Sequence, residues 1–176
     1  MIRKSIKLSL DTCELVYDIQ NKAYLTGEAR RSEGAKPFEA ASNMQASDDD
    51  DNIYQIKRSL CTALASLKSI FGEFMRSDDD DVSLETDNAL NKAVEQNKPF
   101  DLFFSVPSNF KDSAADSLGD EVHAYLVDMA IGDWFSITNK EDAQIYTSRV
   151  EQHIAVIKRA LYRRTRPIKA HYVDPV

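Results

Sequence analysis

The sequence has few of the residues from which covalent cross-links, metal cages and phosphate loops are built. Its two cysteines, Cys13 and Cys61, are too few for a disulfide framework or a cysteine-based metal site. Five glycines and three histidines leave no glycine-rich phosphate loop and no paired-histidine metal motif. No run of about 18 apolar residues occurs, so we predict no transmembrane helix. A signal peptide is not expected, because no long apolar region follows the basic N-terminus.

Charge is unevenly distributed along the 176 residues, which carry a formal net charge of -7. Two runs of four aspartates, at 48–51 and 78–81, make the first half acidic. Residues 158–169 contain six positive and no negative side chains. We therefore expect a polarised molecule with acidic corners and a basic end.

Apolar residues spaced by three and four positions predict helices along most of the chain. The clearest stripe lies within residues 50–75 and consists of Ile53, Ile56, Leu60, Leu64, Leu67, Phe71 and Phe74. Similar patterns predict further helices at 11–31, 83–96, 112–136 and 139–166.

Flanking residues support several of these helices. The first aspartate run precedes the 50–75 helix, where carboxylates interact favourably with the helix dipole. Thr138 and Glu141 have the spacing of a capping box, and Pro167 is expected to end the last helix. We place Leu8 on the apolar face of the first helix, with Leu15 and Ile19.

These helices predict an all-α fold: an antiparallel bundle of about four main helices in a single domain spanning residues 1–176. Residues 32–49 and 97–111 are interpreted as connecting segments. Residues 168–176 are predicted to form an extended tail, because prolines frame them.

The 97–111 segment is rich in phenylalanine and is interrupted by Pro99 and Pro107, which argue against a continuous helix. Two interpretations remain open for it. It is either an extended segment packed over the bundle or a hydrophobic arm that docks on a partner. The candidate partner-binding residues of such an arm are Phe100, Phe103, Phe104 and Phe110.

No catalytic residue, metal ligand or cofactor is predicted. A di-iron bundle requires a histidine three residues after a glutamate, whereas His123 and His153 each follow a glutamate by two. That spacing directs the two side chains to different helix faces. The aspartate runs lack the pattern of a calcium loop, and a carboxylate–metal enzyme is kept only as an alternative.

The basic end supplies the other candidate partner-binding residues, Arg159, Arg163, Arg164 and Arg166. On a helix continuing through residue 166, Arg159, Arg163 and Arg166 share one face. Pairing with an acidic neighbour, docking on a protein and binding nucleic acid are all open. Nucleic acid is the least favoured ligand, because the rest of the chain is acidic and would repel phosphates.

A resemblance adds to this interpretation. The stretch AYLVDMAIGDWF at 124–135, a short turn, and residues 143–167 ending in RRTRP resemble the C-terminal helix pair of tailed-phage head–tail connector (neck or adaptor) proteins. In that family a helix ending in an aromatic residue, often tryptophan, precedes a basic last helix.

The resemblance implies a non-enzymatic virion or prophage structural protein that contacts portal or tail proteins. It also implies a location in the virion or in the cytoplasm of a bacterial host. A homo-oligomer is open, because head-to-tail contacts between unlike surfaces generate rings. The alternative is a cytoplasmic helical-bundle adaptor or regulator that binds one protein partner through 97–111.

Overall fold

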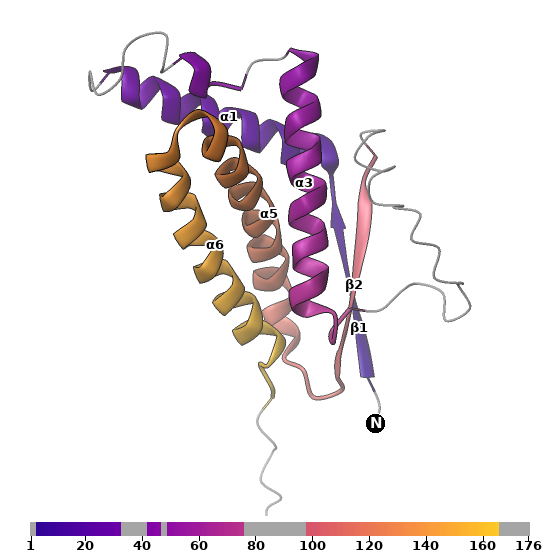
Figure 1. Ribbon diagram of the computed structural model, residues 1–176. Coiled ribbons are helices and arrows are strands. Elements are labelled where there is room, and N and C mark those ends of the chain that lie inside the picture. The colour runs from indigo at the N-terminus through magenta and orange to yellow at the C-terminus, as the bar shows by residue number, and fades with distance from the viewer. Residues whose placement is uncertain (1–2, 33–41, 47–48, 76–97, 166–176) are drawn as a thin grey trace, which may run out of the picture.

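A computed structural model describes residues 3–32, 42–46, 49–75 and 98–165. Four long helices pack together beside a small sheet (Figure 1). The elements are β1 Arg3–Leu10, α1 Thr12–Ser32, α3 Asp50–Phe71, β2 Phe100–Pro107, the 3₁₀ helix η1 Asp112–Ala114, α5 Ala115–Thr138 and α6 Lys140–Leu161. The prediction of four main helices is confirmed. The helix predicted at 83–96, the second aspartate run and the tail at 168–176 lie outside the described residues.

The all-α prediction is confirmed in part: the fold is mostly helical, but it also contains a two-stranded antiparallel sheet. β1 and β2 pair antiparallel, with Arg3 opposite Pro107 and Leu10 opposite Phe100. Leu8 lies in β1 and not on the first helix. Its neighbours alternate between apolar and polar residues, a period of two that is typical of a strand with one buried face.

α5 lies at the centre of the molecule and contacts α1, α3 and α6. Its buried apolar residues occur on most of its sides, which is typical of a helix enclosed by others. They include Leu118, Val122, Tyr125, Leu126, Val127, Ala130, Ile131, Trp134 and Phe135. The apolar faces of both strands join the same hydrophobic cluster.

α6 begins and ends differently from the prediction. The capping box is wrong, because Thr138 belongs to the last turn of α5 and its hydroxyl donates to the Trp134 carbonyl at 3.2 Å. Asn139 occupies the N-cap position of α6. Within α6, Ile145 is 46% exposed, whereas the neighbouring Tyr146 is buried.

The C-terminal end of α6 is set by a tertiary contact. The helix ends at Leu161, before the proline that was expected to stop it. The backbone of Arg163 accepts a hydrogen bond from Lys111 N at 3.2 Å, and Thr165 N donates to the Asn109 carbonyl at 2.8 Å. These bonds to the segment after β2 replace the helical bonds that a longer α6 would make.

A carboxylate links the two strands on their outer face. Asp101 of β2 accepts hydrogen bonds from Lys7 Nζ at 2.8 Å and from the Ser9 hydroxyl at 2.5 Å, both on β1. The hydrogen bond from Lys7, followed by that from Ser9, holds the pKa of Asp101 below its usual range. Stability from this lowered pKa is present above the unfolded-state value of about 3.9. It is lost as pH falls through the folded-state pKa.

We therefore predict that Asp101→Asn lowers the melting temperature near neutral pH and flattens its decline in acid. Thermal melts followed by circular dichroism from about pH 6 down to about pH 2 measure both effects. Glu151, which is exposed in the middle of α6 and away from a helix end, supplies the control substitution, Glu151→Gln. Acid declines of equal slope in the parent and the Asp101→Asn variant would contradict the role of the strand-linking carboxylate.

Candidate functional site

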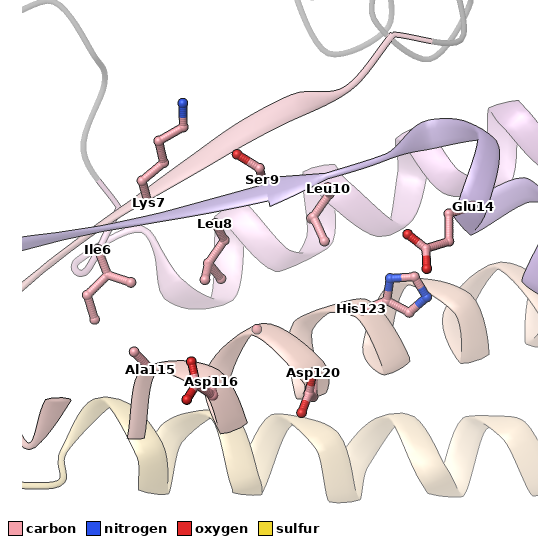
Figure 2. Close-up of a pocket in the computed structure, with 11 residues that line it drawn as sticks. Ile6, Lys7, Leu8, Ser9, Leu10, Glu14, Ala115, Asp116, Asp120 and His123 are labelled. Carbon is pink, nitrogen blue, oxygen red and sulfur yellow. The ribbon is translucent and has the colours of Figure 1, made fainter. Parts of the chain in front are cut away.

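A groove of about 670 Å³ lies between β1, the start of α1 and the N-terminal half of α5 (Figure 2). Ile6, Leu8 and Leu10 of β1 supply most of its apolar lining, and Ala115 and Gly119 of α5 lie opposite. A Cβ atom at Gly119 would lie 3.6 Å from Leu8 Cδ2, which is ordinary van der Waals contact. A residue with a longer side chain at this position would extend into the groove or displace Leu8.

Carboxylates border this apolar floor. Asp116 and Asp120 are exposed and lie four residues apart on α5, hence on one helix face. Glu14 of α1 lies at the other end of the groove, where Figure 2 shows its side chain and that of His123 pointing toward one another. Lys7 also lines the groove, but its Nζ pairs with Asp101 at 2.8 Å. The three remaining carboxylates suit a ligand that carries positive charge beside apolar groups.

β1 has an edge without a strand partner among the described residues, because the only strand it pairs with there is β2. The groove lining includes the five consecutive β1 residues 6–10, so the strand borders the groove along this whole stretch, and Figure 2 shows it running beside α5. The outer edge of β2 is partly covered, since Ser105 N donates to the Phe74 carbonyl at 2.6 Å and Met75 forms a bridge with Phe104. An open edge is a template for pairing with another chain.

A row of polar residues on α1 faces α5 and α6. Its members recur every four residues and so share one helix face. The contacts are Asp18 with His123 Nε2 at 2.8 Å, Lys22 Nζ with Asp128 at 3.0 Å, Thr26 with the Tyr146 hydroxyl at 3.1 Å, and Arg30 Nη2 with Asp142 at 2.5 Å. We name these four pairs the α1 polar seam.

Asp128 is the buried centre of this seam, with 3% of its surface exposed. His153 Nε2 lies 3.2 Å from its carboxylate, and His153 Nδ1 lies 2.7 Å from Glu121. His123 contacts α1 instead, so the predicted divergence of Glu121 and His123 is confirmed. Within the described ranges, no group of three or more histidine, cysteine, aspartate or glutamate residues is placed to hold a metal ion. The geometry is that of a structural ion-pair network between helices.

The phenylalanines predicted to bind a partner lie mainly in the core. Phe100, Phe104 and Phe110 are 7%, 0% and 2% exposed, respectively. Their burial favours the interpretation of 97–111 as an extended segment packed over the bundle, and contact of these three side chains with a partner stays a prediction. Phe103 is half-buried on the opposite face of β2, across from Lys7. Its contact with a partner stays a prediction.

The basic end does not form the single helical face that we expected. Arg159 is exposed on α6, but Arg163 lies beyond the end of the helix, and Arg166 lies outside the described residues. Arg164 is half-buried, and its Nη1 donates to the Leu161 carbonyl at 2.6 Å. None of the described arginines of this end lines the groove, and their binding role stays a prediction.

The first aspartate run lies at the start of α3, as predicted. Asp49 is the N-cap residue, although its side chain makes no capping hydrogen bond, and Asp51 is exposed. The run therefore places negative charge near the positive end of the helix dipole without a side-chain cap at Asp49. Neither Asp49 nor Asp51 lines the groove.

The groove was not predicted from the sequence, although the alternation of Ile6, Leu8 and Leu10 with polar residues is the signal that could have located its strand. No described helix has the length and hydropathy needed to cross a bilayer.

Comparisons of the chain with protein-family models, curated proteins and solved structures find no match. The groove is therefore interpreted from its own chemistry.

Removal of the buried carboxylate tests whether the seam is structural. We predict that Asp128→Ala lowers the free energy of unfolding by about 2–3 kcal/mol, because it leaves Lys22 and His153 without their shared partner. Urea denaturation measures this change. The groove residue Asp120 supplies the matched comparison, since Asp120→Ala should change stability by less than about 0.5 kcal/mol. Equal losses in the two variants would refute the distinction between seam and groove.

Proposed function

We propose that this protein is a non-enzymatic structural or assembly protein that acts through protein–protein contacts, as a phage-type head–tail connector or neck subunit. The observation that carries this proposal is the edge of β1 that has no strand partner among the described residues, beside an acidic groove with an apolar floor. Extended peptides bind such edges by strand addition, in which main-chain hydrogen bonds provide affinity and side-chain pockets provide specificity.

The volume of the groove does not by itself select a peptide ligand, because small-molecule pockets span about 300–1,000 Å³. The strand edge favours the peptide. A row of alternating N–H and C=O groups matches the backbone of another strand, whereas a compact metabolite satisfies few of them.

The connector assignment draws on two features. The hairpin of α5 and α6 contains the residues that resemble the C-terminal helix pair of neck proteins. Rings also require unlike surfaces that meet head to tail, and the acidic groove is unlike the basic end of the chain. Portal proteins, tail proteins and further copies of this chain are the partners we propose. A helical-bundle adaptor would use the same groove for one foreign protein.

Self-association provides the test. In sedimentation velocity at increasing protein concentration, we expect oligomers that weaken as salt screens the attraction to the acidic groove. Asp120→Lys should weaken association by about tenfold, a loss of roughly 1.4 kcal/mol. Glu151→Lys makes the same charge change on the exposed face of α6 and should leave association unchanged.

A negative result has a defined form. A protein that stays monomeric at high concentration and has no affinity for a portal or tail protein encoded near its gene would overturn the connector proposal. Binding to a single unrelated protein, lost in Asp120→Lys and retained in Glu151→Lys, would favour the adaptor instead.

A further inference from the structure

We infer that the groove receives the C-terminal segment 166–176 of a second copy of this chain, added as a strand along the open edge of β1. This inference rests on the proposed assembly function and names the occupant of the same groove. Three observations support it: the length and residue spacing of that segment, its positive charge opposite the carboxylates of the groove, and the place where the described chain ends.

The segment has the length and residue types of an added strand. Seven residues lie between Pro167 and Pro175, and β1 has eight residues. Proline lacks the N–H needed for a ladder, so the two prolines would limit pairing to the residues between them. Ile168, Ala170 and Tyr172 recur with a period of two and would share one face of a strand.

Charge complementarity favours this occupant. Arg166 and Lys169 bring two positive charges, and the groove presents the carboxylates of Glu14, Asp116 and Asp120. The single acidic residue of the segment, Asp174, comes after its basic residues. A basic segment is therefore attracted to this edge, whereas the acidic runs of the chain are repelled from it.

The end of the described chain favours a neighbouring groove over the chain's own groove. Residues 163–165 are held by backbone bonds to 109–111. α6 runs toward the end of the molecule where β1 begins (Figure 1). Because a residue before proline avoids the helical region, Arg166 favours an extended continuation. Entry into the chain's own groove would instead require a reversal at this point. Eleven extended residues span roughly 36 Å, enough to follow β1 of an adjacent copy.

Zero-length carbodiimide cross-linking of the full chain tests the inference. Isotope-labelled and unlabelled copies are incubated together, cross-linked and digested, and the linked peptides are identified by mass spectrometry. We expect Lys169 to be joined to Asp116, Asp120 or Glu14 in links that pair a labelled with an unlabelled peptide.

Substitutions at the groove provide the specificity control. Gly119→Phe fills the groove and should reduce the mixed-label links by about tenfold, because a clash opposes the added strand. Gly119→Ala is the matched control, since its Cβ meets Leu8 at ordinary contact distance. If Gly119→Phe fails to fold, the pair Ile168→Asp and Tyr172→Asp should give the same loss from the segment's side.

Each outcome decides the inference. Links confined to one isotopic copy would place the segment in its own groove and overturn it, and so would the absence of links from Lys169 to the three carboxylates. Oligomers that persist in the Ile168→Asp/Tyr172→Asp variant would also overturn it while leaving the assembly function in place. Failure of the assembly function is recognised separately, by a strictly monomeric protein without affinity for portal or tail proteins.

Discussion

The enclosure of α5 is the constraint on which the rest of the structure depends. Its apolar residues lie on most sides of the helix, so neighbouring elements must cover it nearly all round. α1, α3 and α6 do so along much of its length. Near its N-terminal end, the side that carries Asp116, Gly119 and Asp120 borders the groove. The position of the groove thus follows from which part of a central helix the other elements leave uncovered.

The α1 polar seam complements that constraint. Apolar contacts alone define the orientation of a helix weakly, since apolar packing is not directional. Four polar pairs at intervals of one turn restrict how α1 lies against α5 and α6. Because Asp128 is buried, a shifted helix would leave a charge without its partners. α1 in turn follows directly after β1, so the seam also helps to hold the strand beside the groove.

Helices could be predicted from the sequence because their signal is local. The stripe from Ile56 to Phe71 located α3, and the start of α1 was placed within one residue. The sheet was not predicted, because its two strands are far apart in the chain and each is recognised by a short alternation. Burial of Phe104 depends on its pairing with Ile6, a contact that residue spacing cannot supply. The groove requires β1, α1 and α5 together, so no single segment indicates it.

The central claim is that β1, whose second edge has no strand partner among the described residues, pairs with another strand in the assembled protein. Amide hydrogen exchange within residues 3–10, compared between dilute and concentrated protein, tests it most directly. Pairing predicts that the amides on this edge exchange rapidly in dilute protein and become protected on assembly. In Asp120→Lys, the same protection should require a higher protein concentration. Unchanged exchange of β1 in an assembled protein would contradict the account.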